Sequence, residues 1–263
     1  ETIEVSTFRA NLADNEEKSR FHERNDDGQI LRDNIYGTPE QDAWRRDFTI
    51  NALFYNIQNF SIIDYVGGLK DIEAKLVRSI GDPEGRFVED PVRMIRAVRF
   101  ASTLNFDIET QTAEAIRRNA ERIALASPAR MFEEMQKLFF CGNARDLLVR
   151  LDSYGLLKHM LPEIAEVMQS SEQDRAWLER VTRQLDTWRS HHVKVTPELL
   201  FALLFGLVHE RKIQQLVQDG VPIYHAAEDA VAGHLASLAS RVLIPKAIGR
   251  HLAQIMAVQA HFL

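Results

Sequence analysis

The sequence predicts an α+β fold that is mostly α, with a short α/β segment followed by an all-helical remainder. Strand-like alternation and glycine-containing turns are concentrated in roughly the first 80 residues. From Asp90 onward, apolar residues recur with a helical period almost without a break. We therefore expect the α/β segment to end near residues 80–90.

The first ten residues alternate as a strand does, with Ile3 and Val5 on one face and Glu4 on the other. A strand edge at the first residue implies missing partner strands, so we expect this chain to be an N-terminally truncated fragment. Residues 11–37 are polar, charged and rich in turn formers, and they predict a long loop.

A helix is predicted to begin at Thr38, because Thr38 is a good N-cap, Pro39 suits the first helical position and Gln41 completes a capping box. A strand at Ser61–Tyr65, a turn at Gly67-Gly68, a short helix and a second strand near Leu76–Ile80 follow. The later helices are predicted at 90–103, 108–118, 128–141, 143–153, 161–168, 172–190, 196–208, 210–219, 224–240 and 245–261.

Composition narrows the class of protein. The chain has 263 residues, of which 45% are hydrophobic and 27% charged, as in ordinary globular proteins. Its single cysteine, Cys141, excludes an intramolecular disulfide and a cysteine-rich zinc site, and we expect a cytoplasmic protein. No apolar run approaches the ~20 residues that a membrane span needs, so no membrane partner is expected. The net charge of −6 argues against bulk nucleic-acid binding but allows a local basic groove.

The stretch "FVEDPVRMIRAVRF" carries Glu89 and Asp90 before a proline and then Arg93, Arg96 and Arg99 at every third position. Asp90 is predicted as the N-cap of a helix. One interpretation is a capped surface helix with solvated arginines. In the other, Asp90 and Arg93 form a planar acceptor and donor pair that reads the Watson–Crick edge of a base. Arg96 and Arg99 would then meet phosphates or ribose.

The stretch "AWRRDFTINALFYN" places Arg46 and Asp47 beside Phe48, Thr49 and Asn51. It is consistent with an ordinary amphipathic helix. The alternative is a rigid helix that presents Arg46 to a triphosphate and Asp47 to a metal or sugar. The histidines show no metal-ligand spacing, and we interpret them as surface or core residues.

The order of "EVSTFR", "RRDFTINAL", "DYVGGLKDI", "EDPVRMIRAVRF" and "ARMFEEMQKLF" resembles the class II nucleotidyltransferases, the bacterial poly(A) polymerases and CCA-adding enzymes. The resemblance covers about residues 1–165. The stretch "LRDNIYGTPEQDAWRRDFTINALFYN" is more similar to the poly(A) polymerase branch. The resemblance implies the C-terminal part of a nucleotidyltransferase head at 1–80, a helical neck that recognises the nucleobase at 81–142, and a helical RNA-binding body at 143–263.

The same resemblance implies roles for individual residues. Glu89, Asp90 and Arg93 match the family's Glu-Asp-x-x-Arg motif, in which the acid and the arginine face the base. Arg96 and Arg99 match positions that contact the bound nucleotide.

A second set of matches concerns the catalytic centre. Arg46 and Asp47 match the motif that lines the nucleotide and catalytic site, with Asn51 as a supporting residue of the nucleotide-binding set. Glu4 matches the third carboxylate near the metal centre. Asp47 and Glu4 are therefore the expected catalytic residues.

The family's Gly-Gly-x-Val-Arg-Asp loop and Asp-x-Asp pair are absent from this sequence. In the family that pair binds two Mg²⁺ ions, so we expect no complete metal set and no catalysis by this chain alone. The implied function of the parent enzyme is template-independent addition of AMP from ATP to RNA 3′ ends. The expected partners are ATP and the 3′ ends of mRNA, small RNA or tRNA. Alternatives are a CCA- or A-adding tRNA nucleotidyltransferase and a non-catalytic RNA-binding helical module.

Overall fold

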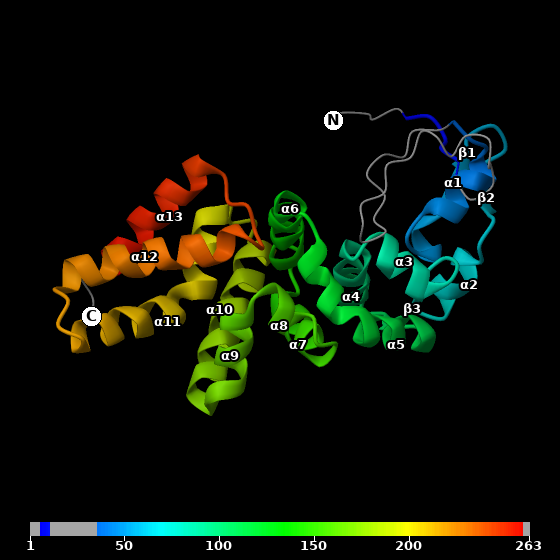
Figure 1. Cartoon of the computed structure of the whole chain (residues 1–263). Helices are drawn as coiled ribbons and strands as arrows, with labels where there is room; N and C mark the ends of the chain where they lie inside the picture. The colour runs from blue at the N-terminus through cyan, green and yellow to red at the C-terminus, as the bar shows by residue number, and fades with distance from the viewer. Residues whose placement is uncertain (1–5, 11–35, 260–263) are drawn as a thin grey trace, which may run out of the picture. The chain divides into compact units, whose positions relative to one another are not determined.

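The computed structural model describes residues 6–10 and 36–259, in two compact units that divide after Arg122. Within these residues, helices dominate and the strands form two-stranded sheets (Figure 1), which confirms the predicted α+β, mostly α, class. The division at Arg122 follows contacts, whereas the predicted head, neck and body are functional segments, and these stay a prediction. No helix in the described part of the chain combines the length and the apolarity that crossing a membrane requires.

The first unit mixes short helices with two small sheets. Its elements are α1 (Pro39–Arg45), the 3-10 helix η3 (Thr49–Asn51), β1 (Leu53–Asn56), β2 (Ser61–Asp64), α2 (Gly68–Glu73), β3 (Leu76–Val77), α3 (Pro83–Glu89), α4 (Val92–Leu104), β4 (Asp107–Ile108) and α5 (Thr110–Asn119). Strand β1 pairs with β2 in antiparallel fashion, with Leu53 opposite Asp64. Strand β3 pairs with β4 in parallel. The 3-10 helix η4 (Ala120–Leu125) follows α5.

Helix α1 begins as predicted and ends earlier than expected. The Thr38 side chain accepts from the Gln41 N–H, and the Gln41 side chain accepts from the Thr38 N–H. The prediction of a rigid helix through Arg46 and Asp47 is wrong, because α1 ends at Arg45 and Arg46 is an extended C-cap residue. Phe48 instead forms an antiparallel bridge with Ser79, and tertiary pairing of the backbone overrides the local helical pattern.

The prediction that Asp90 caps a helix at 90–103 needs correction. Asp90 is the C-cap of α3, a helix that the sequence analysis missed, and Pro91 stands at the N-cap of α4. Helix α3 has its own start signal, since the Asp82 side chain accepts from the Gly85 N–H at 2.9 Å and Pro83 follows. Asp90 Oδ1 still accepts from the Val92 N–H at 3.2 Å. Asp90 therefore lies at a junction between two helices.

The predicted strand at 61–65 and the Gly67-Gly68 turn are confirmed. Gly67 has a φ of +82°, and a Cβ on Gly68 would lie 2.3 Å from the carbonyl oxygen of Thr49. The Asp64 carboxylate accepts from the backbone N–H groups of Val66, Gly67, Gly68 and Leu69. Burial raises the pKa of Asp64, but these hydrogen bonds outweigh it and hold the pKa below its usual value.

The expected first strand and the following loop fall mostly outside the described residues. Within residues 6–10, Arg9 forms an isolated antiparallel bridge with Tyr36. The predicted strand near Leu76–Ile80 is shorter than expected and pairs with β4, which was not predicted. Glu4 lies outside the described residues.

Among the described residues of the second unit, the regular elements are all helices. Its helices are α6 (Pro128–Phe139), α7 (Ala144–Ser153), α8 (Leu157–Met160), α9 (Pro162–Ser170), α10 (Glu172–Ser190), α11 (Pro197–Gln218), α12 (Ile223–Ala239) and α13 (Lys246–Gln259). Helices α11, α12 and α13 pack against one another (Figure 1). The helices predicted at 196–208 and 210–219 form the single helix α11, because no proline or glycine interrupts the sequence between them after Gly206.

Two histidines lie together inside this helical unit. His209 on α11 is fully buried, and its Nε2 lies 3.1 Å from the carbonyl oxygen of Met256 on α13. The ring of His234 on α12 lies 5.7 Å from the His209 ring. Burial lowers the pKa of both imidazoles, the His209–Met256 hydrogen bond opposes this at His209, and proximity to His209 lowers the pKa of His234 further. Both rings are therefore expected to be neutral at pH 7.

Acidification is expected to destabilise the protein through this pair. Because the folded pKa values lie below the unfolded value of about 6.5, stability is full above that value and falls as the pH drops toward the folded pKa values. Urea unfolding at pH 7.5 and 5.5 measures the loss. The double variant His209→Leu/His234→Leu should show a smaller loss than the wild type. The exposed His191→Gln variant serves as control. Equal pH dependence in wild type and double variant would contradict the assignment.

Candidate functional site

Two segments of the first unit, 42–51 and 86–99, supply the described residues of the candidate site. The first segment contains the end of α1, the turn that follows it and η3, and the second contains the end of α3, the junction at Asp90 and α4 as far as Arg99. The predicted residues that these segments bring into one connected set of contacts are Arg46, Asp47, Asn51, Glu89, Arg93 and Arg96. This arrangement was predicted only as a list of residues, not as contacts.

The Asp47 carboxylate is the most heavily bonded member. Its Oδ2 accepts from Arg96 Nε at 2.7 Å and lies 2.6 Å from Arg96 Nη2. Its Oδ1 accepts from Asn51 Nδ2 at 3.1 Å and from the Phe48 N–H at 2.9 Å. The Asp47 side chain is 10% exposed and that of Arg96 is 29% exposed. Asp47 therefore fixes the orientation of Arg96 across a gap of 49 residues in sequence.

Arg46 is held from two sides. Its Nε donates to Asp42 Oδ2 at 3.0 Å, and its Nη1 donates to the Asn51 carbonyl oxygen at 2.8 Å. The guanidinium also lies over the Phe54 ring, 5.0 Å from the centroid. The side chain keeps 41% of its surface exposed. Arg46 is thus a cation in a fixed position with an open side, as an anion ligand requires.

Arg93 lies in the first turn of α4 and contacts Glu89, the last residue of α3. Arg93 Nη1 is 3.5 Å from Glu89 Oε2, and the Arg93 side chain is 15% exposed. The same nitrogen is buried and makes no hydrogen bond within the described part of the chain. The Asp90 carbonyl accepts from the Arg93 N–H at 3.1 Å, so the two residues are the ends of one backbone turn.

Arg99 lies on α4 about one turn after Arg96 and packs on an aromatic ring. Its guanidinium lies 4.3 Å from the centroid of Phe100, and the guanidinium of Arg96 lies 5.4 Å from the same centroid. These cation–π contacts fix the two arginines near one ring. Arg93, Arg96 and Arg99 are therefore not simply solvated on the helix surface. Each of them contacts a different neighbouring side chain.

Sequence reasoning missed two buried residues that support the site. Asp42 is 7% exposed, binds Arg46 and accepts from the Arg9 N–H at 3.2 Å. Arg86 is 9% exposed and contacts both segments. Neither position gives a signal in a single sequence, because charged residues in short amphipathic helices are usually solvated.

A metal site is not formed by the described residues. Among them, no group of three or more His, Cys, Asp or Glu side chains is arranged to hold an ion. The Asp47 carboxylate is already occupied by Arg96, Asn51 and the Phe48 N–H. The residues described here therefore do not fit a two-metal centre by themselves.

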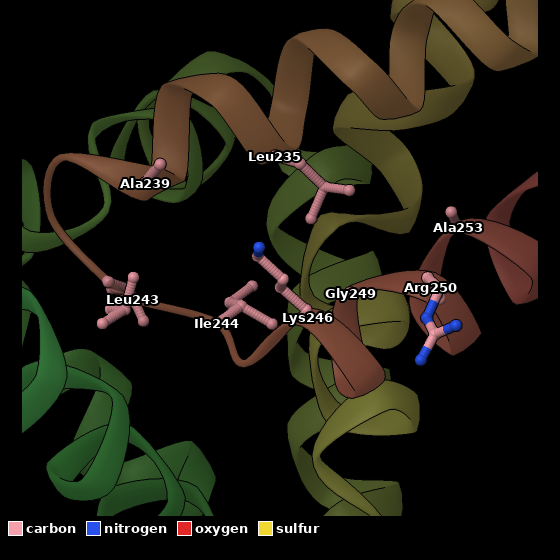
Figure 2. A pocket seen from close by; sticks show the side chains of 9 residues that line it. Leu235, Ala239, Leu243, Ile244, Lys246, Gly249, Arg250 and Ala253 are labelled. Atoms are coloured by element: carbon pink, nitrogen blue, oxygen red, sulfur yellow. The ribbon is translucent and has the colours of Figure 1, made fainter.

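A pocket of about 720 Å³ lies in the second unit, between the end of α12 and the start of α13. Figure 2 shows aliphatic side chains such as Leu235 and Ile244 around it, together with Lys246 and Arg250. No predicted site residue lines it. Its lining lacks the aromatic side chains on which unpaired bases stack, so it offers no nucleobase platform.

Two family models match parts of the chain. Residues 1–78 match the family model described as the poly A polymerase head domain. Residues 105–168 match the model described as the probable RNA and SrmB-binding site of polymerase A.

Curated relatives extend the match over most of the chain. The chain is 39% identical over 251 residues to a protein named poly(A) polymerase I from Salmonella typhimurium, which covers 94% of this chain and 54% of that protein. It is 36% identical over 160 residues to a CCA-adding enzyme of Bacillus velezensis, which covers 61% of this chain and 38% of that enzyme. The chain thus spans about half the length of the poly(A) polymerases that it matches.

The fold is similar to that of a solved enzyme. The crystal structure of the Bacillus stearothermophilus CCA-adding enzyme in complex with CTP aligns with a TM-score of 0.53 and 24% identity. The alignment covers 97% of this chain and 63% of that chain. At this identity the likeness concerns the fold alone.

Proposed function

Because this chain belongs to the nucleotidyltransferase superfamily of bacterial poly(A) polymerases and CCA-adding enzymes, we propose that it is part of a polynucleotide adenylyltransferase. The reaction is the template-independent transfer of AMP from ATP to RNA 3′ ends. The higher identity to poly(A) polymerase relatives over nearly the whole chain, 39% against 31% for a CCA-adding enzyme of the same coverage, supports this reaction over CCA addition.

Arg93 carries the proposal. It is a nearly buried guanidinium with one donor, Nη1, that no described group satisfies by a hydrogen bond. Buried donors in native proteins are normally satisfied, so such a nitrogen points to a ligand. With the carboxylate of Asp90, three residues earlier, as the acceptor, the pair would match the donor and acceptor of an adenine edge, which offers an amino group and a ring nitrogen.

The other site residues take supporting roles in this proposal. Arg46, partly exposed and fixed by Asp42 and Asn51, meets the triphosphate. Arg99 contributes positive charge near the ribose or phosphates. Asp47 contributes through Arg96, whose guanidinium it orients, and Glu89 contributes through Arg93.

Mg²⁺ belongs to the proposed parent enzyme rather than to the residues described here. In that enzyme, two such ions would supply activation of the 3′-hydroxyl and stabilisation of the pyrophosphate leaving group. The described residues do not fit that centre, and the sequence has no Asp-x-Asp pair, so no step is assigned to the ions. Glu4 stays a proposed third carboxylate. Residues 81–142 are proposed to read the base and 143–263 to bind RNA, in a cytoplasmic protein.

A primer-extension experiment tests the function. The full-length gene product is incubated with Mg²⁺ and each NTP in turn, with an unstructured oligoribonucleotide or a tRNA that lacks its CCA end. A long ladder with ATP alone on the plain RNA is expected. Products that stop once the tRNA end is complete would instead support the CCA- or A-adding alternative. A folded protein that extends neither RNA would support a non-catalytic RNA-binding module.

Arg93→Ala is expected to weaken selection for ATP. Removal of the guanidinium leaves a ring nitrogen of the base unpaired, which costs about 1–3 kcal/mol, or a loss of preference of about 5- to 150-fold. Competition of ATP and CTP in the extension assay measures the ratio. Arg117→Ala on α5 is the matched control and should keep the wild-type ratio. An Arg93→Ala variant with undiminished preference would place base reading elsewhere.

A further inference from the structure

Arg86 contacts both segments of the candidate site. It lies on α3, and its side chain is 10% exposed. Its Nη2 donates to the carbonyl oxygens of Arg45, at 2.6 Å, and of Arg46. Its Nη1 donates to Glu89 Oε2 at 3.2 Å. One guanidinium thus connects residues that are 40 and 41 positions apart in sequence.

The two carbonyls are those at the C-terminal end of α1. Carbonyl groups in the last turn of a helix have no partner within the helix, and a cation at that end is favourable. Burial and the nearby charge of Arg93 lower the pKa of Arg86 to about 10, which still leaves it charged at pH 7. Arg86 therefore fixes the direction in which the chain leaves α1 toward Asp47.

Glu89 extends this set of contacts to Arg93, the residue proposed to read the base. Its Oε2 lies 3.2 Å from Arg86 Nη1 and 3.5 Å from Arg93 Nη1. The carboxylate therefore stands between two guanidinium groups that would otherwise repel each other. Loss of Arg86 removes a contact that orients Glu89, and Glu89 in turn contacts Arg93.

We propose that Arg86 is a positioning residue that sets the spacing between the turn carrying Arg46 and Asp47 and the guanidinium of Arg93. It acts through backbone carbonyls and through Glu89, and it contacts no substrate. The inference rests on the proposed function for its effect on nucleotide choice. The spacing matters because phosphates and base of one nucleotide must be held at the same time.

The test uses Arg86→Met, which keeps the length of the side chain and removes its donors, and Arg86→Lys, which keeps the charge. Ile108→Ala on β4 is a core control outside both segments. Three quantities are compared in the full-length gene product: hydrogen exchange of peptides spanning 45–52, the dissociation constants of ATP and CTP, and the melting temperature. The nucleotides are measured by displacement of a fluorescent ATP analogue.

We expect Arg86→Met to speed exchange across 45–52 and to reduce the ATP-over-CTP preference by about tenfold. Arg86→Lys should be intermediate, because an ammonium does not span two carbonyls and a carboxylate as a fork does. Ile108→Ala should lower the melting temperature and keep the preference.

Two outcomes would overturn the inference. The first is unchanged exchange across 45–52 in Arg86→Met. The second is an ATP-over-CTP preference that falls no further in Arg86→Met than in a core variant with the same melting temperature. A wild-type full-length gene product that binds neither nucleotide would contradict the proposed function instead, and hydrogen exchange across 45–52 would then test the role of Arg86 without it.

Discussion

Phe48→Ala is expected to lower the free energy of unfolding by about 3–5 kcal/mol, the usual cost of removing a buried phenyl ring. Phe48 is fully buried and packs edge-on against Phe100, with ring centroids 5.9 Å apart. The loss includes both the burial of the ring and the cavity left behind. Equilibrium unfolding in urea, followed by circular dichroism, measures it.

The position of Phe48 gives this substitution a functional consequence as well. Phe48 separates Asp47 from Thr49, and its backbone bridges Ser79. Its ring therefore anchors the turn that presents Asp47 to Arg96. Phe60→Ala is the matched control, because that ring is 76% exposed and its loss should change stability by less than about 0.5 kcal/mol. Similar losses in the two variants would contradict this account of the turn.

Local signals account for the elements that the sequence predicted well. The capping box at Thr38, the turn at Gly67-Gly68 and the helix at 172–190 each depend on residues close in sequence. Helix α3 was missed although Asp82-Pro83 marks its start, because its seven residues are too few for a periodic apolar pattern. Without that helix, the pattern predicts Asp90 as the first cap, whereas Asp90 lies at the junction between two helices.

Long-range contacts account for what the sequence did not predict. The helix through Arg46 and Asp47 fails because Phe48 and Thr49 pair with Ser79 and Arg78 instead. The motifs suggest which residues to consider for the candidate site, but they do not state the contacts that these residues make. Asp47 and Arg96 are 49 residues apart, and no local pattern states that one will orient the other.

The pairing of Asp47 with Arg96 predicts a loss of stability in Asp47→Asn as well as a loss of turnover. The substitution keeps the shape of the side chain and removes its charge, which leaves the Arg96 guanidinium without its ion pair. Breaking a fully buried pair costs about 3–5 kcal/mol. Because the Arg96 side chain is 29% exposed, we expect about 2–3 kcal/mol here.

A double-mutant cycle separates the structural and functional roles of this pair. Arg96→Met alone leaves the Asp47 carboxylate unpaired, whereas Asp47→Asn/Arg96→Met removes both charges, so its cost in urea unfolding should be smaller than the sum of the single costs. Nucleotide affinity and turnover should not recover with stability in the double variant, because the site then lacks both groups. If stability and nucleotide affinity recovered together, Asp47 and Arg96 would serve the fold alone. If the two costs were simply additive, the short contact between them would not be an energetic pair.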